Sequence, residues 1–269
     1  TAGPAVLELA GVSVRYGGVQ AVDEVSLTVH QDEVVGLIGP NGAGKTTLFD
    51  AISGFAASAS GFVVLQGEDV TGWSPDRRAR AGLGRSFQDA RIFPSLTVAE
   101  NIALSLERHL EVRDHLAAGL GLPAAREVEQ DIAWTVADLV ELMQLGAFRD
   151  KFVSELSTGS RRVVDLAMAI AHDPTVLVLD EPSSGIAQRE TEALGPLLER
   201  IRVETGCAML VIEHDMPLIT TVSDRLMALE LGAVIAEGPP LEVIRDPLVV
   251  ASYLGTGDGA HVSRSGVLA

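Results

Sequence analysis

The chain has 269 residues, of which 47% are hydrophobic and 4% aromatic, and its formal net charge is -17. No apolar run approaches the roughly 18 residues that cross a bilayer, and so large a negative charge opposes binding to the phosphate backbone of a nucleic acid. The single cysteine, Cys207, excludes an internal disulfide and a cysteine-based metal cluster, and its apolar neighbours predict a buried strand position.

The first third of the chain predicts a hairpin followed by a strand, a loop and a helix. Hydrophobic residues alternate with polar ones on both sides of the Gly17-Gly18 turn, which predicts two half-buried strands. A continuous apolar strand, Val34 to Ile38, then runs into a glycine-rich loop and a helix that begins near Lys45. This order of elements is the one that a phosphate-binding loop requires.

A helical lobe is predicted between residues 92 and 152. Thr97-Val98-Ala99-Glu100 is a capping-box sequence that opens one helix. Apolar residues at spacings of three and four from Val128 to Met143 predict a longer amphipathic helix that stops at Gly146. Around the lobe, strands and helices alternate, which favours a parallel sheet. The elements expected there are a strand over 62–65, a helix from Ser74-Pro75 to Gly82, a helix over 160–171, a strand over 176–179, a helix over 190–204, a strand over 208–212 and two short C-terminal helices.

The segment Gly39-Pro40-Asn41-Gly42-Ala43-Gly44-Lys45-Thr46 is a complete phosphate-loop sequence. Its glycines let backbone N–H groups turn toward a β-phosphate, Lys45 supplies positive charge, and the Thr46 hydroxyl can bind Mg²⁺. It predicts ATP and Mg²⁺ as ligands. The residues expected to bind the nucleotide here are Asn41, Gly42, Ala43, Gly44, Lys45 and Thr46, together with Thr47 directly after the segment.

The apolar strand that starts at Val176 ends in two carboxylates, Asp180 and Glu181. Successive side chains of a strand point to opposite sides. Asp180 is therefore expected to face Mg²⁺, and Glu181 to face and polarise the attacking water. Together with the phosphate loop, this strand indicates a nucleoside triphosphatase.

The sequence Leu156-Ser157-Thr158-Gly159-Ser160 precedes that strand and resembles the LSGGQ signature of the ABC transporter ATP-binding family. A helix N-terminus with Ser157 and the Gly159 amide offers an anion site. The resemblance implies that this site serves the γ-phosphate held by a second subunit, so that ATP joins two nucleotide-binding domains in a homodimer or a heterodimer.

The resemblance covers nearly the whole chain and implies its fold. We expect an α/β fold with a P-loop NTPase (RecA-like) core, an N-terminal antiparallel β subdomain and an inserted α-helical subdomain. The implied boundaries are one domain over 1–255, with the core and β subdomain in 1–91 and 153–238, the helical subdomain in 92–152, C-terminal helices in 239–255 and a disordered tail in 256–269.

The family pattern assigns roles to four further positions. Tyr16 matches the aromatic residue that stacks on adenine, with Val22 packing nearby. Gln88 matches the glutamine that reaches Mg²⁺ and senses the permease, and His214 matches the histidine that touches the γ-phosphate. The implied catalytic residues are thus Glu181, His214 and Gln88, and the implied metal ligands are Thr46, Gln88 and Asp180.

Two positions depart from the family pattern. Ser160 stands where Gln or Glu is usual, and Ala187 stands where Asp or Asn is usual. Since Lys45, Asp180, Glu181 and His214 are all present, slowed or asymmetric hydrolysis is expected rather than none. The alternative is a nucleotide-gated, weakly hydrolysing regulatory partner in a heteromeric complex.

Within the family, the stretches Arg85 to Thr97 and Gly238 to Gly255 resemble ATPase subunits of branched-chain amino-acid importers. The implied partners are a second nucleotide-binding domain and a transmembrane permease, with the chain peripheral at the cytoplasmic face of the cell membrane and no nucleic acid as a ligand. Because the chain starts at Thr1 without methionine, a longer parent chain that includes the permease is left open. So are the solute and the direction of transport.

Overall fold

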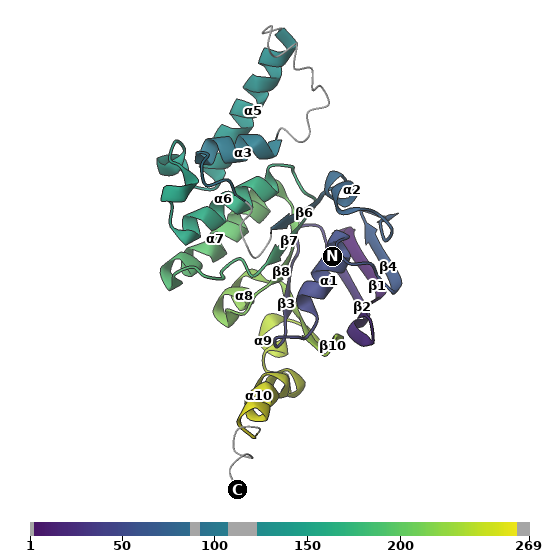
Figure 1. The fold of residues 1–269 in the computed structure, drawn as a ribbon. Coiled ribbons are helices and arrows are strands. Elements are labelled where there is room, and N and C mark those ends of the chain that lie inside the picture. Colours follow the sequence, from purple (N-terminus) through teal and green to yellow (C-terminus); the bar gives the residue numbers. More distant parts are fainter. Residues whose placement is uncertain (1–2, 87–91, 107–122, 263–269) are drawn as a thin grey trace.

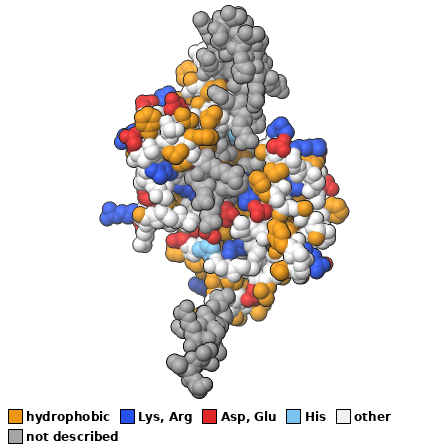
Figure 2. Space-filling view, viewed as in Figure 1, with side chains coloured by type: hydrophobic (Ala, Val, Ile, Leu, Met, Phe, Trp, Pro, Cys, Tyr) orange, Lys and Arg blue, Asp and Glu red, His pale blue; other side chains and the backbone are white. Residues whose placement is uncertain are grey.

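The computed structural model describes residues 3–86, 92–106 and 123–262, with the backbone alone for residues 123–129 and 255–262. Two sheets form the body of the protein (Figure 1). Among the described residues, no helix combines the length and the apolar composition needed to cross a membrane. Hydrophobic, acidic and basic side chains are interspersed on the face drawn in Figure 2.

The smaller sheet has four antiparallel strands in the order β2-β1-β4-β5. The predicted hairpin at Gly17-Gly18 is confirmed, since β1 and β2 pair across it. The register of that pairing shifts between Val12 and Val14, and a shift of this kind changes which residues of a strand face the core. The four strands are β1 (Ala5–Tyr16), β2 (Val19–His30), β4 (Ser60–Leu65) and β5 (Glu68–Asp69).

The larger sheet has six strands in the order β10-β9-β3-β8-β7-β6. The pairs β3–β8, β3–β9, β6–β7 and β7–β8 are parallel, as the alternation of strands and helices predicted. Among the described strands of this sheet, only β10 pairs antiparallel with its neighbour, β9. The carboxyl ends of the parallel strands therefore meet along one edge. The strands are β3 (Val34–Ile38), β6 (Leu83–Ser86), β7 (Val176–Asp180), β8 (Ala208–Ile212), β9 (Arg225–Glu230) and β10 (Ala233–Gly238).

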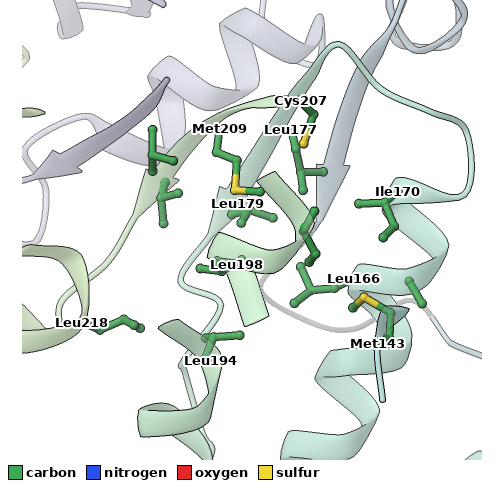
Figure 3. Close-up of a cluster of buried hydrophobic side chains, with 14 of the residues drawn as sticks. Met143, Leu166, Ile170, Leu177, Leu179, Leu194, Leu198, Cys207, Met209 and Leu218 are labelled. Atoms are coloured by element: carbon green, nitrogen blue, oxygen red, sulfur yellow. The ribbon is translucent and has the colours of Figure 1, made fainter. Parts of the chain in front are cut away.

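The central strands of the larger sheet bury both faces, which is why they read as continuous apolar runs. In β7, Leu177 and Leu179 belong to a core cluster shared with helices α3, α5, α6, α7 and α8. Val176 and Val178 belong to a second cluster shared with helix α1 and the smaller sheet. Figure 3 shows the first cluster, where side chains of β7 and β8 meet those of α6 and α7.

Helices complete the body and extend it at both ends. Figure 1 shows α3 and α5 at one end of the molecule and α10 at the opposite end. The predicted capping box is confirmed at α3, where the Glu100 carboxylate accepts from Thr97 N and Thr97 Oγ1 accepts from Glu100 N. The helices are α1 (Lys45–Ser53), α2 (Pro75–Arg80), α3 (Val98–Leu106), α5 (Pro123–Leu142), α6 (Thr158–Ile170), α7 (Gln188–Thr205), α8 (Met216–Val222), α9 (Pro240–Val243) and α10 (Pro247–Val262), with short 3-10 turns at Gly146–Phe148 and Val153–Glu155.

Several helix boundaries differ from the sequence prediction, among them those of α6 and α10. Helix α6 begins at Thr158 rather than near 160, because Ser157 is its N-cap and accepts a hydrogen bond from Ser160 N. Helix α10 continues to Val262, whereas disorder was expected from residue 256. A glycine such as Gly255 costs a helix about 1 kcal/mol but does not forbid it, so Gly255 alone does not end α10.

Candidate functional site

The glycine-rich loop lies between β3 and α1, at the edge where the parallel strands end. Gly39 and Gly44 pack tightly there: a Cβ added to either residue would come within 2.2 Å of Leu229 O or 2.3 Å of Ala21 O. Gly42, with φ of +84°, faces open space instead. The loop is thus fixed at both ends by close backbone contacts and is accessible in the middle.

A pocket of about 380 Å³ opens over this loop. It brings the loop together with the end of β7, the segment after β8 and the start of β2. Its lining contains every loop residue predicted to bind the nucleotide, and also Glu181 and His214. The lining residues are Val19, Gln20, Ala21, Asn41, Gly42, Ala43, Gly44, Lys45, Thr46, Thr47, Glu181, His214 and Leu231.

Lys45 is the cation of the loop, and its ammonium is buried against backbone oxygens. Its Nζ donates to Gly39 O at 2.7 Å and to Pro40 O at 3.0 Å. Burial lowers the pKa of Lys45, and the nearby carboxylates of Glu181 and Asp180 oppose that shift. Helix α1 starts here without a side-chain cap on its first N–H groups. The ammonium and these N–H groups together make an anion site.

The two carboxylates at the end of β7 have different neighbours. Glu181 Oε1 lies 2.9 Å from His214 Nε2, in the pocket. Asp180 is buried beside Arg85 of β6, with 3.8 Å between Oδ2 and Nη2. Burial raises the pKa of Asp180, and the Arg85 guanidinium opposes the shift. Glu181 therefore faces the pocket, and Asp180 lies behind it at the same edge of the sheet.

Glu213 is a residue of this region that the sequence did not single out. Its buried carboxylate accepts from Ser183 N at 2.7 Å, from Ser183 Oγ at 2.8 Å and from His214 N at 3.0 Å. It thus ties the segment after Glu181 to the segment that carries His214. No sequence motif marked it, because its partner Ser183 is 30 residues away in the chain.

Ser157 and Gly159 do not line the pocket over the phosphate loop. Ser157 Oγ donates to Glu190 Oε1 at 2.7 Å, and Gly159 lies against the same carboxylate. Gly159 lines a separate cavity of about 390 Å³ together with Glu190 and Arg162. Within one chain, the signature sequence and the phosphate loop are therefore parts of different sites.

The other residues predicted to bind the nucleotide or the metal are Tyr16, Val22 and Gln88. Tyr16 is exposed at the end of β1 and pairs in register with the pocket residue Val19, but it does not line the pocket. Val22, which was expected to pack nearby, is fully buried and does not line the pocket. Its neighbours Val19 to Ala21 line the pocket instead, as does Leu231 on the turn between β9 and β10. Gln88 lies outside the described residues.

Comparison with known proteins gives a consistent result. A sequence model of the ABC transporter family matches residues 22–184, and one of the branched-chain amino acid ATP-binding cassette transporters matches residues 233–259. The chain is 36% identical over 250 residues to the high-affinity branched-chain amino acid transport ATP-binding protein BraF of Pseudomonas aeruginosa, covering 93% of this chain and 98% of that protein. It is 34% identical over 251 residues to the lipopolysaccharide export system ATP-binding protein LptB of Escherichia coli, with the same coverage.

The fold agrees with these relatives. The crystal structure of the ADP conformation of MJ1267, an ATP-binding cassette of an ABC transporter, superposes with a TM-score of 0.80 and 27% identity, over 94% of this chain and 99% of that one. Both sheets of the predicted architecture are present, one antiparallel and one mostly parallel with the phosphate loop at its edge. The chain therefore belongs to the ABC transporter family, as an ATP-binding subunit related to branched-chain amino acid transport ATP-binding proteins.

Proposed function

We propose that this chain hydrolyses ATP at the interface of two nucleotide-binding domains and so drives a membrane permease that imports branched-chain amino acids or a similar small solute. The contact between Glu181 and His214 at the mouth of the phosphate loop carries this proposal. It brings a carboxylate and an imidazole together at the edge of a pocket that is lined by the phosphate loop and Lys45.

The chemistry follows from these positions. Lys45 exchanges its two carbonyl partners for phosphate oxygens, and the N–H groups of the loop bind the β-phosphate. Glu181 orients and polarises the attacking water, and His214 fixes that carboxylate and contacts the γ-phosphate. Tyr16 stacks on the adenine, because it is exposed beside the pocket residue Val19.

The donor set at this edge fits Mg²⁺ held largely by the nucleotide. No described cluster of three or more His, Cys, Asp and Glu side chains could hold a metal by itself. The Thr46 hydroxyl and the Asp180 carboxylate would supply oxygen ligands, and the family pattern assigns a third to Gln88. Mg²⁺ usually combines one or two carboxylates with phosphate oxygens and water. When bound, the ion neutralises charge that develops on the phosphates.

The second half of each site comes from a partner subunit, because Ser157 and Gly159 lie away from the phosphate loop of their own chain. Those residues cap the γ-phosphate held by the partner. The permease receives the dimer at the cytoplasmic face of the membrane. A net charge of -17, with basic side chains scattered on the face in Figure 2, supports a partner other than nucleic acid.

The transport names of the relatives do not favour the alternative of a weakly hydrolysing regulatory partner. The names of the relatives do not identify the transported solute, since a lipopolysaccharide export protein is nearly as similar in sequence as the amino-acid transport proteins. The stretch that matches the branched-chain amino acid family model, 233–259, supports amino acids.

The test is transport by the complex that co-purifies with this chain from membranes of its native host, reconstituted into lipid vesicles. We expect ATP-dependent uptake of radiolabelled leucine, and loss of phosphate release by about 100-fold or more in Glu181→Gln, as for removal of a general base. Phosphate release that is near zero in both native and variant chains would favour the regulatory alternative. Active hydrolysis without leucine uptake would reject the solute alone.

A further inference from the structure

Arg162 lies on α6, five residues after the helix N-cap Ser157, and its side chain is only 5% exposed. Its guanidinium extends from the signature helix to the segment after β7. Nη2 donates to Asp180 O at 3.0 Å and to Glu181 O at 2.9 Å, and Nε donates to Pro182 O at 3.2 Å. One buried side chain thus binds three successive carbonyls of the segment that carries both carboxylates of the site.

This segment needs such support, because its backbone leaves the strand at Glu181. Glu181 has a φ of +47°, which lies in the left-handed region that residues other than glycine rarely adopt. Its N–H still donates to Ile212 O at 3.0 Å, as in the sheet, and its carbonyl accepts from Ser184 N as well as from Arg162. An unfavourable backbone conformation persists only where the surrounding contacts hold it. Arg162 is one of those contacts, and it comes from a different element.

The guanidinium itself is held in place. Asp165, one turn along α6, has Oδ2 at 3.5 Å from Arg162 Nη1. A planar guanidinium with fixed N–H directions can bind several oxygens at once, whereas a lysine ammonium is a single point charge. A movement of α6 is therefore transmitted to the backbone of Asp180 and Glu181 through a rigid group.

We infer that Arg162 is a positioning residue that couples the signature helix to the Glu181 carboxylate of the same chain. The inference rests on the proposed function, in which Ser157 binds the nucleotide of the partner subunit while Glu181 serves the nucleotide of its own. Arg162 then lies between the two half-sites. Binding of the partner's γ-phosphate at α6 places Glu181 to orient the attacking water at the nucleotide of its own chain, so that the two sites hydrolyse ATP cooperatively.

The neighbouring arginine provides a matched control. Arg161 Nε donates to Val153 O at 3.0 Å, and Arg161 Nη2 donates to Ser154 O at 2.7 Å. Arg161 and Arg162 occupy the same helical turn and each binds backbone carbonyls, but Arg161 binds the segment before the signature and not the segment of the carboxylates.

The experiment compares Arg162→Lys with Arg161→Lys and with the native chain. Phosphate release is measured against ATP concentration, ATP stoichiometry counts the folded sites, and thermal midpoints are recorded. For Arg162→Lys we expect kcat per folded site to fall by about 100-fold, the effect of displacing a reacting group by about 1 Å. KM should stay within roughly two-fold, since binding to the loop is unchanged, and the Hill coefficient should fall toward one. Arg161→Lys should keep the native kcat and Hill coefficient.

A merely structural role of Arg162 would lower the thermal midpoint and the number of folded sites, and would leave kcat per site and the Hill coefficient at their native values. That result overturns the inference, as does an equal loss of kcat in Arg161→Lys. If the native chain releases no phosphate, the proposed function and this inference both fail. Native hydrolysis with an unchanged Arg162→Lys rejects the inference alone.

Discussion

The hydroxyl of Tyr253 accepts a hydrogen bond of 2.8 Å from the backbone N–H of Gly39. This contact joins α10, near the C-terminus, to the first residue of the phosphate loop, 214 positions earlier. Burial raises the pKa of Tyr253, and the hydrogen bond from Gly39 opposes the shift. The start of the loop is therefore held from two sides, by this hydroxyl and by the Lys45 ammonium on the Gly39 carbonyl.

Tyr253→Phe should destabilise the protein, because it leaves the Gly39 N–H without this acceptor. An unsatisfied buried donor costs about 1 to 3 kcal/mol, and we expect the free energy of unfolding to fall by about that amount in urea titrations. KM for ATP should rise, since the loop is less well fixed. The matched control is Tyr16→Phe, which removes the other tyrosine hydroxyl at an exposed position and should change stability by under about 0.5 kcal/mol. Equal stability of the two variants would contradict a role for the contact.

The sequence predicted those parts of the site that are contiguous in the chain. The phosphate loop and the end of β7 follow local rules, because a strand, a glycine-rich turn and a helix lie within a few residues of one another. Contacts between distant residues had no such signal, as with Gly39 and Tyr253 or with Ser157 and Glu190.

Val22 shows a second limit of prediction from sequence, which concerns the side of a strand that faces the core. Alternation indicates that the two sides of a strand differ, but a register shift in the hairpin between Val12 and Val14 moves Val22 into the core. No residue type in the segment marks that shift, so the side chains that line the pocket could not be identified before the pairing was known.

Arg78→Met should cause a large loss of stability without touching the site. The buried guanidinium of Arg78 donates to Thr71 O and Trp73 O and to two carbonyls at the end of α1, Ala51 O and Ile52 O. Removing these donors from buried acceptors should cost about 3 kcal/mol, or roughly 6 to 12 °C in the thermal midpoint. Calorimetry on the purified chain measures this shift.

The control for Arg78 is its neighbour. Arg77 stacks over the Trp73 ring at 3.5 Å, a surface contact worth about 0.5 to 1 kcal/mol. Arg77→Met should therefore lower the midpoint by only about 1 to 4 °C. Similar losses in both variants would show that the carbonyl contacts of Arg78 contribute little.

Cys207 should report unfolding, because its thiol is buried and burial raises its pKa. The thiolate is the reactive form, so a raised pKa leaves less of it at pH 8 than an exposed cysteine would have. We expect an aromatic disulfide reagent to label the native chain at least about 100-fold more slowly than the chain in urea, since labelling requires opening of the structure. Rapid labelling of the native chain would place this strand end in a region that opens readily.

Lys45→Met should separate nucleotide binding from stability. Charged hydrogen bonds contribute about 1.5 to 3 kcal/mol each, so ATP affinity should fall by about 100-fold when the phosphates lose this partner. Without nucleotide, the midpoint should change by under about 2 °C, because burial of the ammonium, which lowers its pKa, offsets its bonds to Gly39 O and Pro40 O. Thermal scans with and without ATP measure both quantities, since a ligand that binds only the native state raises the midpoint. A native-like rise with ATP in the variant would contradict the role of Lys45.

Glu190→Gln should strengthen the ATP-dependent dimer. The carboxylate of Glu190 accepts from Ser157 Oγ at 2.7 Å and lies 3.4 Å from Ala187 N, so a negative charge stands where the proposed function brings the γ-phosphate of the partner subunit. Two unit charges about 4 Å apart in water repel by about 1 kcal/mol, which corresponds to about five-fold in the dissociation constant. The glutamine keeps an oxygen that can accept from Ser157 and removes the charge. Sedimentation of Glu190→Gln in the Glu181→Gln background, which prevents turnover, measures this constant with ATP, and the single variant Glu181→Gln is the reference. A weaker dimer would mean that the charge of Glu190 orients Ser157 for the phosphate rather than competing with it.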